Sequence, residues 1–557
     1  MIRYTTLFLF LQIAFLTSSA QHTFTHQDSL RGSITPEREW WDLTFYHLAI
    51  KVNPSDKTIT GTNEVRFTAL KDGKVIQIDL QNPMKITEVK YKDAVLKVRD
   101  DGNAHFITLP EIVKKGSQTS VLISFGGVPV EAANPPWDGG ITWRTDRNGK
   151  PFIASSCQGI GASIWWPCKD HEYDEVDSMK ISVTVPDSLV AISNGRQYAS
   201  AGREGWATYH WQVSNPINNY GVSINIGDYV QMHETYGGEK GNLDLDYWVL
   251  SYMKDTAEVQ FQQVPRMVRA FEHWFGPYPF YEDSYKLVQV PFLGMEHQSA
   301  VAYGNGFMNG YRGRDLSLTG WGLKFDYIII HESGHEWFAN NITHLDAADM
   351  WVHEGFTSYS ECLYLDYYYG KEAAAEYIIG TRPGIRNDRP IIGNYNVNNP
   401  GSGDMYYKGA NLLHMIRTTV QNDSIWRLTL RGLNREFYHR NVSSKQVEEY
   451  ISKSVGRDLS HVFDQYLRDV RIPVLEYMLT DRGVRYRWVQ CVREFDLPVQ
   501  AMVDGKMVWL EPQTTWKQLD VEGGVSSFAV SQDYYVATLN LTGDVFKAKE
   551  SPGEQGE

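Results

Sequence analysis

Apolar and polar residues alternate along much of the first 235 residues. Apolar side chains fall on every second position, or nearly so, in five segments: 48–52, 75–80, 121–125, 181–185 and 222–226. Glycine, proline, asparagine and aspartate punctuate the chain between them, which is typical of antiparallel strands with one buried face. We therefore predict an N-terminal antiparallel β domain over residues 21–235, interrupted by a long aromatic-rich loop at 134–168.

The periodicity of the chain then changes to that of helices. Residues 255–276 carry apolar side chains at helical spacing and end at Gly276, a frequent helix stop. A capping box formed by Ser443 and Gln446 predicts the start of another helix. We predict a mainly helical domain over residues 236–470.

Strands return after Pro473. Turn sequences at 481–483 and 504–505 separate short apolar segments, as in β-hairpins. This pattern predicts a small C-terminal β-sandwich over residues 471–546, followed by a polar tail at 547–557. The fold class is therefore α+β with several domains.

A metal-binding motif lies in the helical part of the chain. Residues 331–335 read His-Glu-Ser-Gly-His, so the two histidines lie one helical turn apart and can bind one ion. Two histidines and one carboxylate form a recurring ligand set of catalytic zinc, which leaves a fourth position for water. We predict one zinc ion per chain, held by His331, His335 and Glu354. Glu332 is the predicted general base that takes a proton from the water.

The flanking residues predict that this motif lies inside a packed helix. Residues 326–330 supply a mostly apolar run before it, and Trp337 and Phe338 continue the helix after it. Glu361 follows Glu354 by seven positions, on the same helical face. It suits a role in orienting a histidine ligand and a surface role equally well.

Further motifs surround the metal-binding residues. Residues 294–298 read Gly-Met-Glu-His-Gln and follow an apolar stretch that predicts a strand running toward the site; residues 406–409 read Tyr-Tyr-Lys-Gly. In order and spacing these motifs resemble the zinc aminopeptidase family that includes aminopeptidase N and leukotriene hydrolase. The resemblance extends to residues 275–280 and 156–170 and covers roughly residues 35–545. It implies that the helical domain is a thermolysin-like catalytic domain.

The resemblance also implies roles for single residues. Glu296 matches the glutamate that binds the free α-amino group of the substrate, and Tyr406 matches the tyrosine that stabilises the tetrahedral intermediate. Gln158 and Met295 are expected to line the first subsite, and Gly294 belongs to the strand that contacts the substrate backbone. The role of Glu296 has physical sense, because a mispaired buried charge costs about 3–5 kcal/mol and so discriminates against blocked amino termini.

The chain departs from the family pattern at three positions near these motifs. Leu293 replaces the first glycine of the strand motif and His297 replaces its last asparagine, so the backbone contacts of that strand do not follow from the resemblance alone. His353 replaces the asparagine before the third ligand. We predict that His353 is solvent-facing or structural, since a fourth protein ligand would exclude water from the metal.

Composition narrows the classes of partner. The 557 residues are 42% hydrophobic and 22% charged, as in a globular protein of several domains, and the net charge is −14 with a pI near 5.6. This acidity argues against nucleic acid or an anionic membrane as the main partner. Beyond the amino terminus, no segment approaches the roughly 20 apolar residues of a membrane span.

The first 20 residues have the pattern of a secretory signal peptide. Arg3 precedes an apolar stretch at 7–16, and small residues at 18–20 precede Gln21. We expect an exported protein, periplasmic or secreted, whose mature chain begins at Gln21. Cys157, Cys168, Cys362 and Cys491 could form disulfides in an exported protein. The resemblance implies that Cys157 and Cys168 are unpaired, which favours free buried thiols.

The sequence thus predicts a zinc aminopeptidase that acts on peptides with a free amino terminus. A zinc endopeptidase remains the alternative if Glu296 has only a structural role, and a catalytically silent peptide-binding protein is the alternative from another class. Many relatives carry a large helical domain after the sandwich; this chain ends before it, so we expect a more open cleft.

Overall fold

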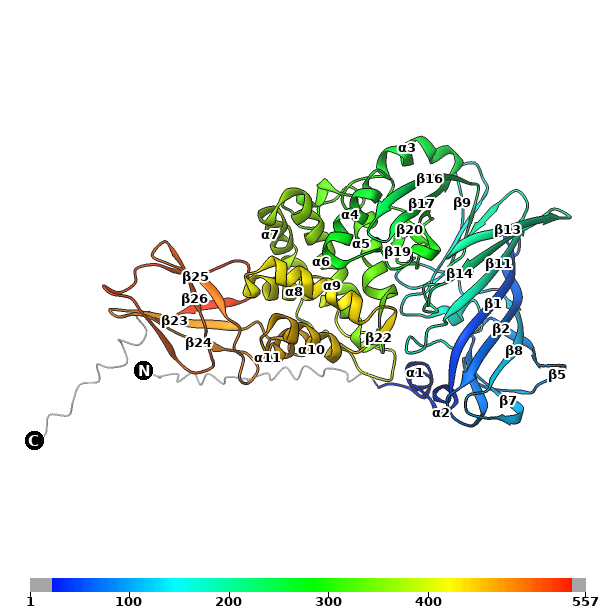
Figure 1. The fold of residues 1–557 in the computed structure, drawn as a ribbon, viewed down its shortest axis with the longest axis horizontal. Coiled ribbons are helices and arrows are strands. Elements are labelled where there is room, and N and C mark those ends of the chain that lie inside the picture. The colour runs from blue at the N-terminus through cyan, green and yellow to red at the C-terminus, as the bar shows by residue number, and fades with distance from the viewer. Residues whose placement is uncertain (1–22, 543–557) are drawn as a thin grey trace, which may run out of the picture.

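The computed structural model describes residues 23–542 (Figure 1). The predicted signal peptide at 1–20 and the polar tail at 547–557 lie outside the described residues. Among the described residues, no helix combines the length and the apolar character needed to cross a bilayer.

A large sheet forms the N-terminal part of the molecule. Two short helices precede it, α1 (His26–Gly32) and α2 (Pro36–Glu39). Its eight strands run in the order β13 (Arg196–Arg203), β14 (Trp206–Val213), β11 (Ser178–Pro186), β1 (Trp41–Asn53), β2 (Thr58–Ala69), β8 (Gln118–Gly127), β4 (Lys85–Tyr91) and β5 (Ala94–Val95). All neighbours are antiparallel except β1 and β11, which pair in parallel.

Two smaller sheets pack with it around one hydrophobic core. One contains β12 (Val190–Ile192), β15 (Asn225–Gly227), β10 (Pro151–Ser156) and β9 (Gly140–Thr145); the other contains β3 (Gly73–Asp79), β7 (Ala104–Val113) and β6 (Val98–Asp101). The prediction of an uninterrupted loop at 134–168 was wrong, because β9 and β10 form a hairpin inside it. This hairpin carries the chain to Gln158.

A five-stranded sheet opens the second part of the molecule. Its order is β16 (Tyr229–Gly238), β17 (Gly241–Leu250), β18 (Tyr285–Gln289), β20 (Val301–Tyr303) and β19 (Gly294–Met295). The two-residue strand β19 pairs antiparallel to β20 and lies at the edge of the sheet. The strand predicted from the apolar stretch before residue 294 is β18, which ends at Gln289, and the chain turns before it enters β19.

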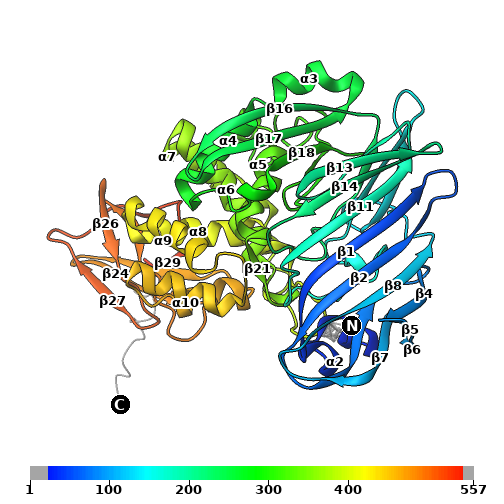
Figure 2. The ribbon, with the colours of Figure 1, turned by 45° about the vertical axis from the view of Figure 1, so that its right-hand side comes forward.

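Helices pack beside this sheet (Figures 1 and 2). They are α3 (Lys254–Gln260), α4 (Gln263–Phe275), α5 (Tyr327–Gly334), α6 (Trp351–Tyr369), α7 (Lys371–Gly380), α8 (Tyr407–Val420), α9 (Asp423–Glu436), α10 (Ser444–Val455) and α11 (Ser460–Phe463). The helical segment predicted over 255–276 is broken at Phe261 and Gln262. The capping box at Ser443 is present, as predicted, and α10 ends before Gly456, which adopts a left-handed conformation with φ 71°.

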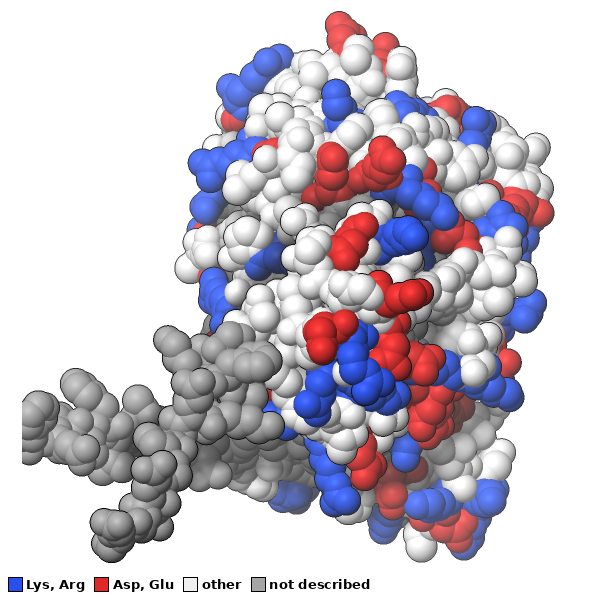
Figure 3. Space-filling view, turned by 90° about the vertical axis from the view of Figure 1, so that its left-hand side faces the viewer, with Lys and Arg blue, Asp and Glu red and all other residues white. Residues whose placement is uncertain are grey.

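Past residue 470, the regular secondary structure of the described residues consists of β-strands. One sheet has the order β27 (Lys517–Asp520), β24 (Gly483–Val489), β23 (Val474–Thr480) and β29 (Ala537–Asn540); the other has the order β26 (Lys506–Leu510), β25 (Val499–Val503) and β28 (Phe528–Val530). Both predicted hairpin turns are present. On this side of the molecule, acidic and basic side chains are interspersed (Figure 3).

Candidate active site

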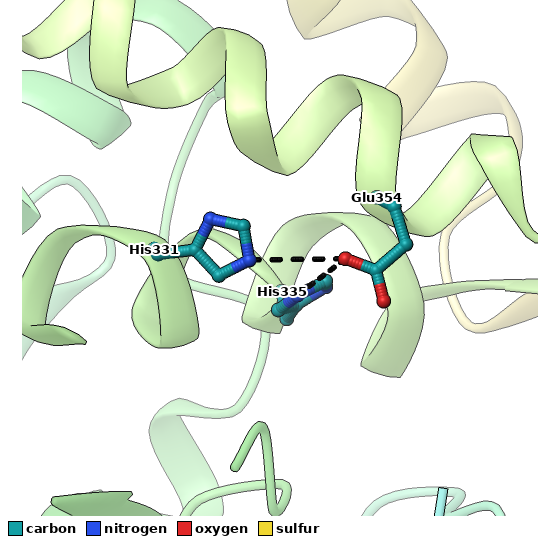
Figure 4. A group of neighbouring side chains, drawn as sticks. All are labelled: His331, His335 and Glu354. Carbon is teal, nitrogen blue, oxygen red and sulfur yellow. Dashed lines mark ion pairs between the residues drawn. The ribbon is translucent and has the colours of Figure 1, made fainter. Parts of the chain in front are cut away.

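Helices α5 and α6 bring the three predicted metal ligands together (Figure 4). Nε2 of His331 lies 3.7 Å and Nε2 of His335 lies 3.4 Å from Oε2 of Glu354. One ligand atom from each residue lies within 4.8 Å of the other two. All three side chains are buried.

Neighbouring groups orient both imidazoles through the ring nitrogen that faces away from Glu354. Nδ1 of His331 lies 2.7 Å from Oε1 of Glu361, and the Tyr377 hydroxyl donates to the other oxygen of that carboxylate. This arrangement settles the two roles left open for Glu361, because its carboxylate lies against the His331 ring. Such outer partners fix ring orientation and raise the basicity of the ligand.

His335 is oriented by a break in the helix. Nδ1 of His335 lies 3.1 Å from both the Phe338 carbonyl oxygen and the Thr357 hydroxyl. The prediction that the helix continues through Phe338 was wrong, because α5 ends at Gly334 and the backbone is non-helical at Phe338 (φ −129°) and Ala339 (φ 155°). The break turns the Phe338 carbonyl toward the imidazole, where it serves the site.

The donor set fits zinc. Two Nε2 atoms face one carboxylate, and Oε2 of Glu354 is buried without a hydrogen-bond partner among the described residues. Burial alone would raise the pKa of Glu354, but the two imidazoles hold it well below its usual range. An anionic oxygen flanked by two imidazole nitrogens matches the histidine and carboxylate ligands of catalytic zinc.

The predicted base and amine-binding carboxylates lie beside this triad. Glu332 is buried, and burial raises the pKa of its carboxyl to about 7. Glu296 is 2% exposed, and burial also raises its pKa. Oxygens of Glu296 and Glu332 and a nitrogen of His335 lie within 4.8 Å of one another.

Gln158 connects the amine-binding residue to the metal ligands. Its amide donates to Oε1 of Glu296 at 2.7 Å and to Oε1 of Glu354 at 2.8 Å. The sequence predicted only that Gln158 lines the first subsite. Asn340 was missed altogether: its amide donates to the Glu296 backbone carbonyl at 2.9 Å, a contact that depends on the break after α5 and has no sequence signal.

Tyr406 precedes the first residue of α8 and completes the group. Its ring lies 6.1 Å from the ring of His331, with an angle of 19° between the two planes. Together with the eight other predicted site residues, it lines a cleft of about 790 Å³. His353 is buried rather than solvent-facing and accepts a hydrogen bond from the His344 backbone N–H at 2.9 Å, so its role is structural.

A buried metal triad with an adjacent carboxylate base, set in an open cleft, defines a metal-dependent hydrolase. The chain belongs to peptidase family M1: the Peptidase M1 N-terminal domain matches residues 43–220 and the Peptidase family M1 domain matches residues 259–466. This membership assigns zinc as the cofactor that the triad holds.

Three curated relatives are distant from this chain in sequence. Leukotriene A-4 hydrolase of Xenopus laevis is 21% identical over 75% of this chain and 68% of its own length. Aminopeptidase N of Lactobacillus helveticus is 22% identical over 79% of this chain and 52% of its own length. Human aminopeptidase B is 24% identical over 47% of this chain and 36% of its own length, so the chain spans only about a third of that relative.

Solved structures share the fold. The M1 zinc metallopeptidase from Deinococcus radiodurans superposes with a TM-score of 0.67 and 20% sequence identity, covering 78% of this chain and 95% of that one. A variant of that protein was solved with a Tyr-Ser-Ala substrate. The agreement supports the order of the N-terminal β domain and the helical catalytic domain.

Proposed function

We propose that this protein is a zinc aminopeptidase that removes amino-terminal residues from peptides. The observation that carries the proposal is the position of Glu296, a buried carboxylate beside the metal triad. Among the described residues, no lysine or arginine lies within ion-pair distance of it. A buried carboxylate without a cationic partner is costly unless a cation reaches it, and the ammonium of a peptide amino terminus is such a cation.

The residues of the site divide the reaction between them. When bound, zinc would polarise the scissile carbonyl and lower the pKa of a water molecule. Glu332 takes the proton of the attacking water and passes it to the leaving amine. The Tyr406 phenol donates to the oxyanion as charge develops there, a contribution commonly worth ~10²–10³ in rate. Glu296 and Gln158 hold the amino end.

The edge strand β19 supports the same placement of substrate. Gly294 and Met295 pair with β20 on one side only, so the other side of the strand offers backbone donors and acceptors to an extended peptide. A peptide added there would run past the triad with its amino end at Glu296. Met295 and Gln158 would then face its first side chain.

Paired peptides with free and acetylated amino termini test this proposal. We expect the zinc-loaded protein to hydrolyse only the free peptide, a chelator to abolish hydrolysis, and Glu296→Ala to lower kcat/KM by about 10²–10³-fold through loss of the ammonium contact. Glu372→Ala, which removes an exposed carboxylate on α7, is the matched control. Equal cleavage of both peptides would establish an endopeptidase, and cleavage of neither would favour a peptide-binding protein.

We further propose that the protein is exported. The support is the arrangement of charged, apolar and small residues over positions 1–20. Mass spectrometry of the mature protein tests this directly, with Gln21 expected as the first residue. An intact amino terminus at Met1 would contradict it.

A further inference from the structure

Basic side chains are scarce in the described lining of the active-site cleft. Arg386 is the only lysine or arginine among the described residues that line it. Five carboxylates line the same cleft: Glu296, Glu332, Glu354, Asp388 and Asp404. An isolated guanidinium in an acidic cleft would be expected to pair with one of them.

The structure instead fixes the Arg386 backbone and leaves its side chain free. The Asp404 carboxylate accepts the backbone N–H groups of Arg386 at 2.8 Å and Asn387 at 2.6 Å, while Asp388 accepts the Ser402 hydroxyl. The exposed Arg386 guanidinium makes no hydrogen bond or ion pair with any residue in the described part of the chain. Asp388 and Asp404 thus accept hydrogen bonds from other groups, and the Arg386 guanidinium is available to bind a ligand.

The segment that carries Arg386 lies on the His331 side of the triad. Gly384 is seated on the Tyr407 ring, because a Cβ at Gly384 would lie 2.7 Å from that ring. Tyr407 directly follows Tyr406, whose ring lies 6.1 Å from the His331 ring, and both tyrosines line the cleft. Arg386 follows Gly384 by two positions and lines the same part of the cleft.

The amino-binding residues occupy the other side of the triad. Glu296 has an oxygen within 4.8 Å of His335 and Glu332, whereas the His331 ring stacks on Tyr327 at 5.0 Å. A peptide whose ammonium is at Glu296 therefore directs its leaving portion toward Tyr327, Tyr407 and Arg386. Any anionic group on that portion would meet a guanidinium that has no other partner.

We propose that Arg386 binds a carboxylate on the leaving-group side of the substrate. The carboxylate is either the carboxyl terminus of a short peptide or an acidic side chain beyond the scissile bond, since the planar fork of arginine binds both in the same way. This inference rests on the proposed aminopeptidase function and adds a preference within it. It makes Arg386 a specificity-determining residue outside the reacting centre.

Peptides matched in sequence but differing in one carboxylate test the inference. One series, from dipeptide to hexapeptide, is compared as free acids and as carboxyl-terminal amides; a second series of amidated hexapeptides carries Glu or Gln at the second or third position. We expect kcat/KM to favour the carboxylate form about tenfold in one series. A preference confined to short free acids identifies the carboxyl terminus as the ligand, and a Glu-over-Gln preference at one position identifies a side chain.

Variants of the arginine separate local contact from overall charge. Arg386→Ala should bring the preference to about one, and Arg386→Glu should reverse it. Arg314→Ala removes an exposed charge from a segment next to the cleft-lining residue Tyr311 and should keep the wild-type preference. An Arg386→Ala enzyme with the wild-type preference, or a wild type with none, overturns the role of Arg386. Cleavage of no peptide at all refutes the proposed function, and this inference with it.

Discussion

At the scale of single residues, the predicted catalytic base Glu332 has room for its carboxylate because residue 294 is a glycine. A Cβ at Gly294 would lie 2.9 Å from Oε1 of Glu332 and 2.8 Å from Cγ2 of Ile328. Such contacts are closer than real side-chain carbons tolerate, and Ile328 is fully buried on α5. Gly294 therefore serves by leaving space, and its backbone does not need a left-handed conformation.

We predict that Gly294→Ala lowers kcat/KM by about 10²-fold while the protein remains folded. The added methyl group displaces the Glu332 carboxylate from the position of a proton acceptor, and a well-placed general base is worth about 10²–10⁴-fold. Steady-state kinetics on a free-amino peptide, with a thermal melt to confirm folding, measure this. Gly403→Ala adds a methyl group in open space beside the same cleft and is the control. Activity of Gly294→Ala within twofold of wild type would contradict the argument.

At the scale of elements, α5 is a short helix that begins and ends for different reasons. Its start is local, because the Asp326 side chain accepts the backbone N–H groups of Ile328 and Ile329. Its end is imposed by tertiary contacts: Asn340 is tied to the Glu296 carbonyl, and the Thr357 hydroxyl contacts the Phe338 carbonyl. The break is thus held from outside the helix.

This difference explains which parts of the site could be predicted from the sequence. His331, Glu332 and His335 lie within five consecutive residues, and helical spacing alone places the two imidazoles on one face. Glu354 lies on a second helix, α6, and was predicted as the third ligand from the ligand set of catalytic zinc. The backbone break at Phe338 and Ala339 coincides with no glycine or proline, so the pattern predicted a continuing helix. The bridge from Gln158 to Glu296 joins residues far apart in sequence and follows only from packing of the two domains. The order of the domains could be predicted from periodicity, because apolar residues recur at the spacing of strands in the two β domains and at the spacing of helices between them.

We predict that Asp326→Ala destabilises the protein by about 2–4 kcal/mol. Beyond the helix cap, Asp326 accepts hydrogen bonds from Tyr303, Asn305 and Gln260 at 2.7–2.8 Å. Losing a cap costs about 0.5–2 kcal/mol, and the buried Tyr303 hydroxyl, left without its acceptor, adds about 1–3 kcal/mol. Asn305 and Gln260 keep other acceptors and add little. Denaturant unfolding of the metal-free protein measures the loss. Asp326→Asn keeps one acceptor oxygen and should lose less; equal losses for both variants would show that the cap is unimportant.

At the scale of the whole molecule, the C-terminal β domain supports the cleft. Its core is continuous with that of the helical domain, which disfavours independent motion of the two. Arg382 donates from its guanidinium to the backbone carbonyls of Gln532, Asp533 and Tyr534, and the Asn387 amide donates to the Tyr535 hydroxyl at 2.9 Å. The segment from Arg382 to Asn387 therefore links the β domain to Arg386 at the cleft.

The interface between the helical domain and the C-terminal β domain also contains a titratable pair, which makes the stability of the protein depend on pH. Nε2 of His414 lies 3.0 Å from Oδ1 of Asp533, and His414 is 7% exposed. Burial lowers the pKa of His414 below its usual 6.5 despite the neighbouring carboxylate, whose own pKa is lowered chiefly by the hydrogen bond from His414. Below pH 6.5 the unfolded chain takes up a proton that the folded chain resists.

Acidification should therefore weaken the protein through His414, because a histidine with a lowered folded pKa gives stability that is present above pH 6.5 and lost below it. We predict that His414→Gln makes the free energy of unfolding fall less steeply between pH 7 and pH 5, by at most about 1.4 kcal/mol per pH unit. Denaturant midpoints at half-unit intervals measure the slope. Identical slopes for wild type and His414→Gln would show that this histidine titrates alike in the folded and unfolded chains.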